Sequence, residues 1–237
     1  MSTLPTVLIT GASSGIGATY AERFAKRGHK LVLVARDKAR LEALADHLRA
    51  EAKVSIDVLP ADLNQEADIA AVEAQLRDDA SIGVLINNAG TAQSGGFLQQ
   101  SAESIERLIG LNTTALTRLA AAVAPRFAQA GIGAIVNIGS VVGFAPEFGM
   151  SIYGATKAFV LFLSQGLNLE LGSKGVYVQA VLPAGTRTEI WDRAGIDVKT
   201  LPDLMDVGEL VDAALVGFDR RELVTIPPLH AAERWDA

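Results

Sequence analysis

The chain has 237 residues, of which 49% are hydrophobic and 20% are charged, so it can bury a large core and is not expected to be disordered. Its formal net charge of −6, with no cluster of lysine or arginine, disfavours nucleic acid as a partner. Cysteine is absent and the three histidines are widely spaced, so we expect no disulfide and no metal site.

The first six residues show no signal-peptide pattern, and no apolar run approaches the roughly 20 residues that cross a bilayer. We therefore expect a cytoplasmic protein without a membrane partner. Short apolar, β-branched runs then predict strands at 7–10, 31–35, 54–59, 84–86, 134–138, 176–181 and 223–226. Segments of helical periodicity lie between them, at 15–27, 37–52, 65–79, 101–130 and 151–172.

The predicted strands are apolar on both faces and alternate with helices, which is typical of parallel strands covered on both sides. We predict an α/β fold, a Rossmann-like doubly wound parallel sheet of about seven strands with helices on both faces. No linker or repeat divides the chain, so residues 1–237 are expected to form a single domain. The less periodic stretch 184–205 is expected to be a surface loop with a short helix, placed like a lid.

A glycine-rich loop joins the first predicted strand to the first predicted helix and reads Thr10-Gly11-Ala12-Ser13-Ser14-Gly15-Ile16-Gly17. Glycines in such a loop permit a tight turn, a close approach of a pyrophosphate and close packing of the helix on the strand. The helix N-terminus adds free N–H groups that favour phosphate. An ordinary turn is the alternative, but the strand before and the helix after favour a dinucleotide site. Its expected contacts are Gly11, Ser13, Ser14, Gly15, Ile16 and Gly17.

The spacing Gly-x-x-x-Gly-x-Gly, preceded by threonine, resembles the short-chain dehydrogenase/reductase family. Seven separated segments between residues 6 and 227 match that family in order. The resemblance implies an NAD(P)-dependent oxidoreductase that moves a hydride between the nicotinamide and a carbonyl or secondary alcohol.

The end of the second strand indicates which nicotinamide is bound. An acidic residue there accepts from the ribose 2′-hydroxyl of NAD, whereas this chain has Ala35 followed by Arg36, which suits the 2′-phosphate of NADP. Asp37 could be the acidic residue if the register is shifted, although an N-cap of the next helix suits it equally well. We therefore expect NADP, with NAD as the less favoured cofactor.

Further cofactor contacts follow from the resemblance. Asp62, with Leu63, matches the family's adenine-binding position, although Asp62 could also be a helix N-cap. Asn88, Ala89 and Gly90 match a segment that supports the sheet and lines the cofactor. Pro183, Gly185 and Thr188 match a segment that contacts the nicotinamide carboxamide. Here Ala184 stands where the family usually has glycine, which implies strain or a turn moved to Gly185 if a positive φ is required.

Tyr153 and Lys157 are four residues apart and therefore share one face of a predicted helix. A tyrosine titrates near about 10, and a neighbouring ammonium is expected to lower that pKa. The resemblance makes both residues catalytic and cofactor-binding. Ser140 follows the fifth predicted strand, where it can orient the reacting oxygen. Asn112 matches the family's fourth catalytic position, where it interrupts a helix and holds a water that connects the lysine to solvent.

Apolar residues near these positions predict a carbonyl or alcohol substrate with an apolar substituent. They are Val141, Val142, Phe144, Pro146 and Phe148, with Gln93 and Trp191. The helix at 151–172 is apolar on most faces, and family members associate through it, so we expect a homodimer or homotetramer. Some members also extend further at the C-terminus, so this chain is expected to be shortened beyond Trp235.

Two other readings stay open. One is another reaction of the family, either hydroxysteroid oxidation or 3-oxoacyl-thioester reduction. An acyl-carrier partner of the reductase would favour a basic patch, which Arg187 and Arg193 only weakly suggest. The other is a non-catalytic NADP-binding sensor, but such a protein usually loses the tyrosine or the lysine, and both are present.

Overall fold

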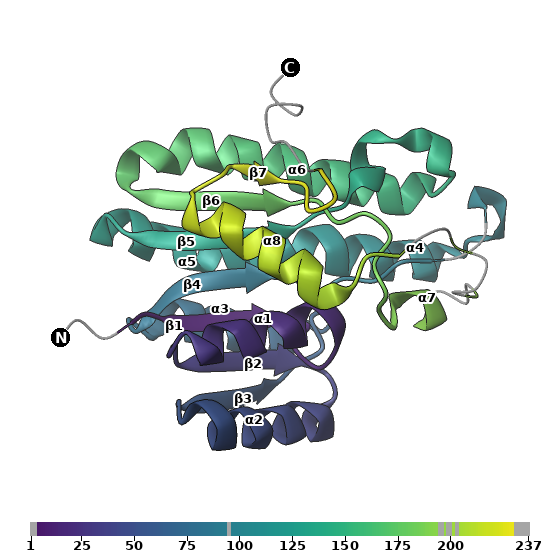
Figure 1. Cartoon of the computed structure of the whole chain (residues 1–237). Coiled ribbons are helices and arrows are strands. Elements are labelled where there is room, and N and C mark those ends of the chain that lie inside the picture. The colour runs from purple at the N-terminus through teal and green to yellow at the C-terminus, as the bar shows by residue number, and fades with distance from the viewer. Residues whose placement is uncertain (1–3, 94–95, 194–196, 198–200, 202–203, 230–237) are drawn as a thin grey trace.

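Seven parallel strands form one sheet in the order β3-β2-β1-β4-β5-β6-β7. The computed structural model describes residues 4–93, 96–193, 197, 201 and 204–229 (Figure 1). The strands are β1 (Thr6–Thr10), β2 (Leu31–Ala35), β3 (Ile56–Pro60), β4 (Ile82–Asn87), β5 (Gly133–Ile138), β6 (Val176–Val181) and β7 (Val224–Thr225). The predicted α/β fold and its doubly wound sheet are confirmed.

Helices cover both faces of the sheet (Figure 1). One face carries α1 (Gly15–Lys26), α2 (Lys38–Ala52) and α8 (Val207–Asp219), and the other carries α3 (Glu66–Asp78), α5 (Leu116–Ala130) and α6 (Ser151–Leu171). Shorter segments are α4 (Ala102–Ile109), α7 (Ile190–Arg193) and the one-turn helices Phe97–Gln99, Val141–Phe144, Pro146–Phe148 and Gly172–Lys174.

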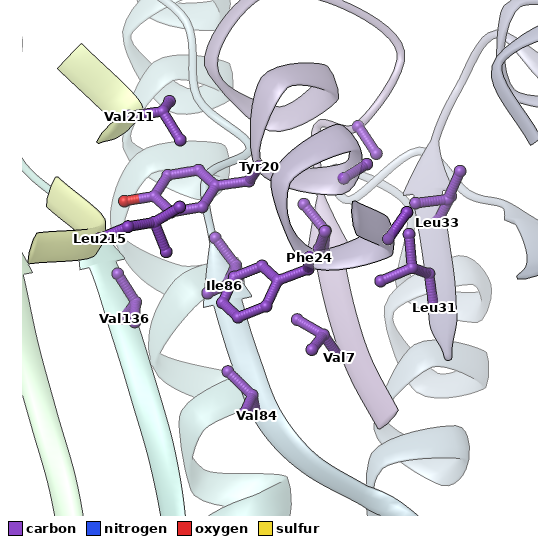
Figure 2. Packing of buried hydrophobic residues seen from close by; sticks show 14 of the residues in the cluster. Val7, Tyr20, Phe24, Leu31, Leu33, Val84, Ile86, Val136, Val211 and Leu215 are labelled. Carbon is purple, nitrogen blue, oxygen red and sulfur yellow. The ribbon is translucent and has the colours of Figure 1, made fainter. Parts of the chain in front are cut away.

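Each face of the sheet has its own apolar core because the strands are buried on both sides. On one face, Tyr20 and Phe24 of α1 pack against Val7, Ile86 and the α8 residue Leu215 (Figure 2). The sheet order reverses at β1, which has β2 on one side and β4 on the other. In open α/β sheets, ligands bind outside the carboxyl ends of the strands at such a switch point.

Two helical segments differ from the sequence-based expectation. The predicted helix 101–130 is divided into α4, a π-helical turn Gly110–Ala115 and α5. Helix α8 was missed because it follows the poorly periodic stretch 184–205. Its N-cap is Asp206, whose carboxylate accepts hydrogen bonds from the backbone N–H groups of Gly208 and Glu209. Within the described residues, no helix is long and apolar enough to cross a membrane.

Candidate active site

A cleft of about 750 Å³ lies along the carboxyl ends of β1, β2, β4, β5 and β6. Its walls include the glycine-rich loop after β1, the end of β2, the loop after β4 and the loop after β6. The cleft is therefore long enough to connect the adenosine position expected at β2 with the Ser140–Tyr153–Lys157 cluster. No cluster of metal-ligating side chains occurs among the described residues.

The glycine-rich loop has the backbone that a pyrophosphate site requires. Gly15 lies at φ +53°, in the left-handed region that favours glycine, and it lines the cleft. A Cβ on Gly17 would lie 2.3 Å from the Gly11 carbonyl oxygen, so only glycine lets α1 begin this close to the loop. Gly17 itself does not line the cleft. Gly17 therefore has the helix-packing role that the motif predicts, whereas its predicted direct contact with the cofactor does not appear in the lining of the cleft.

Thr10 joins the glycine-rich loop to the segment that follows β4 through hydrogen bonds. The sequence did not predict this role for Thr10. The Thr10 hydroxyl accepts hydrogen bonds from the backbone N–H groups of Asn88 and Ala89, both at 3.0 Å. The Asn88 side chain donates in return to the carbonyl oxygens of Thr10 and Gly11, at 2.9 and 3.2 Å. The two loops that would hold the pyrophosphate and the central part of a dinucleotide are thus held as one unit.

At the β2 end of the cleft, Arg36 is exposed and makes no ion pair or hydrogen bond with any described residue. Asp37 instead caps α2, since its carboxylate accepts from the backbone N–H of Arg40 at 3.0 Å. Asp62 also lines the cleft. It is not the cap of α3, which begins after Gln65. Arg36, the cation expected to bind the ribose 2′-phosphate, is therefore available. Asp37, the acidic residue that would favour NAD, instead caps α2.

Ser140, Tyr153 and Lys157 meet at the other end of the cleft. The Lys157 ammonium donates to the Ile138 carbonyl oxygen at 2.9 Å and lies 5.6 Å from the centre of the Tyr153 ring. The two residues share one face of α6, as their spacing predicts. Ser140 follows β5 and caps the short helix Val141–Phe144, and its hydroxyl donates to the Pro183 carbonyl oxygen at 3.3 Å.

Burial determines the proton affinity of this cluster. It raises the pKa of Tyr153 to about 12, against the opposing effect of a hydrogen bond with Ser140. It lowers the pKa of Lys157 to about 8. The sequence-based expectation of a lowered tyrosine pKa is wrong for the protein alone, because desolvation of the phenolate is the dominant effect. The site therefore holds a protonated phenol, which is the form that can donate a proton.

Asn112 lies in the π-helical turn between α4 and α5, where the predicted interruption of the helix occurs. Its side chain donates to the Thr91 carbonyl oxygen and the Thr156 hydroxyl, and it accepts from the Thr91 N–H. It is fully buried and does not line the cleft. Asn112 therefore supports the loop after β4 and the start of α6 and does not face a ligand directly.

Behind the cluster, a second buried polar network joins three elements. The Asn87 side chain of β4 donates to Asn137 of β5 at 3.0 Å, and Asn137 donates to Ser164 of α6 at 3.0 Å. All three side chains are buried. Asn87 also donates to the Leu116 carbonyl oxygen, although its own side-chain oxygen has no partner among the described residues. Buried hydrogen bonds of this kind hold neighbouring elements in one arrangement. The network fixes α6, and with it Tyr153 and Lys157, against the sheet.

The sequence profile of the short chain dehydrogenase family matches residues 5–198. This chain belongs to the short-chain dehydrogenase family. A very-long-chain 3-oxoacyl-CoA reductase from Bos taurus is 36% identical over 197 residues, which are 78% of this chain. They are 63% of that reductase, so the chain spans less than two thirds of the relative's length.

Solved members of the short-chain dehydrogenase family are more similar. A short-chain dehydrogenase from Sphingobium yanoikuyae, solved in complex with NADPH, is 81% identical, with a TM-score of 0.97 over 98% of this chain and 91% of that chain. A bulky-bulky ketone specific alcohol dehydrogenase from Comamonas testosteroni is 73% identical, with a TM-score of 0.93 over 99% of this chain and 90% of that chain.

Most of the residues predicted for a short-chain dehydrogenase site do line the cleft. They are Gly11, Ser13, Ser14, Gly15, Ile16, Arg36, Asp62, Leu63, Asn88, Ala89, Gly90, Ser140, Tyr153, Lys157, Pro183, Gly185 and Thr188. Ala184 brings no strain, because neither it nor Gly185 has a positive φ. The chain therefore tolerates alanine where the family usually has glycine.

The predicted apolar substrate wall is only partly correct. Val142 and Trp191 line the cleft, but Val141, Phe144, Pro146 and Phe148 do not. Phe144 and Phe148, in the one-turn helices Val141–Phe144 and Pro146–Phe148, are exposed. Met150 and Ile190 line the cleft and were missed. Met150 also lines a small second cavity together with Gln93, Phe97 and Tyr153.

The loop after β6 forms the remaining wall of the cleft. Thr186 pairs with Met205 in an isolated parallel bridge, and the Trp191 indole N–H donates to the Thr186 carbonyl oxygen at 2.6 Å. A Cβ on Gly15 would lie 3.3 Å from the Thr188 methyl group, so Thr188 covers the glycine-rich loop. The predicted short helix in this loop is α7. The side chain of Arg193, proposed as part of a basic patch, lies outside the described residues.

Proposed function

We propose that this chain is an NADPH-dependent carbonyl reductase that acts on ketones with bulky, apolar substituents. The observation that carries the proposal is the meeting of Ser140, Tyr153 and Lys157 in the same cleft as a dinucleotide-type glycine loop. The solved relatives, one in complex with NADPH and one named for bulky ketones, support the choice of cofactor and substrate. The whole chain acts as one catalytic domain.

The residues of the cleft fit a dinucleotide. The backbone of Gly11, Ser14 and Gly15 would hold the pyrophosphate, Asp62 would hold the adenine and Arg36 the ribose 2′-phosphate. Lys157 would hold the nicotinamide ribose, and Pro183, Gly185 and Thr188 would flank the nicotinamide. When bound, NADPH supplies the hydride for the carbonyl carbon.

The chain's own contribution is to hold the carbonyl and to move a proton. Ser140 donates a hydrogen bond to the carbonyl oxygen, and Tyr153 donates a proton to the same oxygen as negative charge develops there. A pKa of about 12 keeps the Tyr153 phenol protonated at neutral pH. Lys157 raises the positive potential around the oxygen and, with Asn112, lies on the path by which the proton is replaced. Val142, Met150, Ile190 and Trp191 exclude water from the reacting centre.

A second candidate is the reduction of 3-oxoacyl thioesters, which the similarity to very-long-chain 3-oxoacyl-CoA reductases favours. That substrate is also a ketone, so Ser140 and Tyr153 would have the same roles. Arg187 is exposed in the loop after β6, where it would face an acidic carrier or the phosphates of a coenzyme. The greater identity to the ketone-specific enzyme makes the bulky ketone the first substrate to test.

The test is NADPH consumption with a ketone that carries two aromatic substituents, compared with a methyl ketone and a 3-oxoacyl thioester. We expect the first substrate to have the highest kcat/KM. A higher kcat/KM for the thioester would favour the second candidate. Tight NADPH binding with no turnover of any of the three would contradict both and would support a sensor. Expression followed by cell fractionation tests the expected cytoplasmic location.

We also propose that the protein is a homodimer or homotetramer that associates through α6. Phe159, Phe162 and Leu169 of this helix are 42%, 80% and 83% exposed, which is unusual for large apolar side chains on one helix. Sedimentation should give the mass of two or four chains, and Phe162→Glu should reduce it. Ile132→Glu, at another exposed apolar position, is the matched control and should leave the mass unchanged.

A further inference from the structure

An ion pair joins the two walls of the cleft at its β2 end. Arg40, in the first turn of α2, donates from Nη1 to both carboxylate oxygens of Glu189, at 2.9 and 2.8 Å. Glu189 belongs to the loop after β6, 149 residues further along the chain. Arg40 and Glu189 both line the cleft, together with Arg36 and Ser14.

The position of this pair gives it a direct relation to the cofactor. Among the described residues that line the cleft, the arginines are Arg36 and Arg40, and both lie at the end expected to receive the ribose 2′-phosphate. Asp37 lies 3.5 Å from Arg40 Nε, so two carboxylates share the Arg40 guanidinium. A phosphate monoester carries a charge of about −1.5 to −2 at pH 7 and has three acceptor oxygens, so it is a stronger partner for arginine than one carboxylate.

The ion pair is also weak enough to exchange. The side chains of Arg40 and Glu189 are 50% and 44% exposed. Such exposed pairs contribute only about 0.2–1 kcal/mol, because water solvates both charges and long side chains lose freedom in the pair. A phosphate that enters the cleft can therefore replace the Glu189 carboxylate at low cost.

We propose that Arg40 is a second ligand of the cofactor's 2′-phosphate and that Glu189 is the anion it exchanges for that phosphate. The inference rests on the proposed NADPH dependence. Exchange removes the Arg40–Glu189 contact between α2 and the loop that carries Thr188, which covers the glycine-rich loop, and Trp191, which lines the cleft. Recognition of the 2′-phosphate is thereby coupled to the wall of the substrate pocket, and Glu189 lowers the affinity for NADPH by competing for Arg40.

The test is calorimetric titration of the full chain with NADPH, with NADH, and with the fragments 2′,5′-ADP and 5′-ADP. Arg40→Gln should weaken NADPH and 2′,5′-ADP about tenfold, because it removes a charged hydrogen bond, while NADH and 5′-ADP change less than twofold. Glu189→Gln should tighten NADPH and 2′,5′-ADP about two- to fivefold and leave NADH unchanged. When Arg40→Gln and Glu189→Gln are combined, the tighter binding caused by Glu189→Gln should disappear, because that tightening depends on Arg40.

The neighbouring pair Lys38–Glu42 provides matched controls. It lies on the same helix, at 3.5 Å, is more exposed and does not line the cleft, so Lys38→Gln and Glu42→Gln should bind all four ligands as the parent does. In a Trp235→Phe background, Trp191 is the remaining tryptophan. Binding of 2′,5′-ADP, which has no nicotinamide, should change its fluorescence, whereas 5′-ADP should not.

Two results would overturn the inference. If Glu189→Gln weakens NADPH and NADH equally, the pair closes the cleft over either cofactor and does not compete with the phosphate. If Arg40→Gln binds NADPH as the parent does, Arg40 is not a phosphate ligand. Failure of the parent protein to bind NADPH would instead remove the proposed function, so the two failures are distinguishable.

Discussion

Two parts of the cleft are held in different ways. One is the floor, by which we mean the residues at the carboxyl ends of β1, β4 and β5 with the glycine-rich loop and the start of α6, and the other is the loop after β6. The floor is built from buried polar residues with several partners each, such as Thr10 with Asn88 and Ala89, and Asn87 with Asn137. Among the described residues, the contacts of the loop include the bridge between Thr186 and Met205, the indole hydrogen bond of Trp191 and the exposed ion pair of Glu189 with Arg40. The floor is thus fixed before any ligand arrives, whereas the loop can adjust to the cofactor and the substrate at small cost.

Among the variants of the cleft, the largest fall in activity is expected at Tyr153. Tyr153→Phe removes the proton donor and should lower kcat/KM for ketone reduction about 10²- to 10⁴-fold, with NADPH affinity almost unchanged. Tyr20→Phe is the matched control, because the Tyr20 hydroxyl is buried without a hydrogen-bond partner among the described residues. That control should keep full activity and equal or greater stability. Retained activity in Tyr153→Phe would show that the proton comes from elsewhere.

A variant of Lys157 tests whether a residue that supports activity lowers the stability of the folded protein. Lys157→Met should lower kcat/KM about 10²-fold, because the tyrosine and the cofactor lose a positioning cation. The same change should raise the free energy of unfolding at pH 7 by about 1–3 kcal/mol, because a buried charge is removed. Calorimetry and activity measured on the same sample separate the two effects, and a less stable variant would contradict the argument.

The difference in unfolding free energy between the parent and Lys157→Met should depend on pH. The pKa of Lys157 falls from 10.5 to about 8 on folding, so between pH 8 and 10.5 the unfolded chain binds more protons than the folded one. Below pH 8 both states are protonated and the desolvation penalty is fully present. The parent should therefore gain stability relative to Lys157→Met as pH rises from 8 to 10.5. A constant difference across that window would show that Lys157 is not desolvated.

Gly17 tests the rigidity of the glycine-rich loop. A Cβ there would lie 2.3 Å from the Gly11 carbonyl oxygen and 2.5 Å from the Asn88 side chain, so Gly17→Ala must shift the loop. We expect a loss of about 1–3 kcal/mol of unfolding free energy and weaker NADPH binding. Gly166→Ala, in α6 with no atom of the same chain near the added Cβ, should instead stabilise the single chain by about 0.5–1 kcal/mol. Because Gly166 shares a helix face with Phe162, the mass of this variant is measured by sedimentation as well. Unchanged NADPH affinity in Gly17→Ala would contradict a rigid floor.

The same division explains what could be predicted from the sequence. The predicted site residues lie in short local motifs next to strand ends or in the helices that follow, so strand prediction and the family resemblance placed Gly15, Asn88, Ser140 and Tyr153 in one cleft. The loop depends on pairs distant in sequence, and no local pattern predicts that Arg40 meets Glu189 across 149 residues. The raised pKa of Tyr153 was also unpredictable, because burial of the phenol follows from packing and not from spacing.

The smallest predicted effect lies in the loop. Trp191→Phe keeps an aromatic wall but removes the indole N–H that donates to Thr186 at 2.6 Å. We expect the unfolding free energy to fall by less than about 1 kcal/mol, because a single partly exposed hydrogen bond contributes little. We expect KM for bulky ketones to change a few-fold, about 1 kcal/mol at most, while kcat and NADPH affinity stay near the parent values. Because Tyr153 and the glycine-rich loop do not depend on this bond, a large fall in kcat would mean that the floor and the loop are coupled, and that the loop takes part in positioning the proton donor.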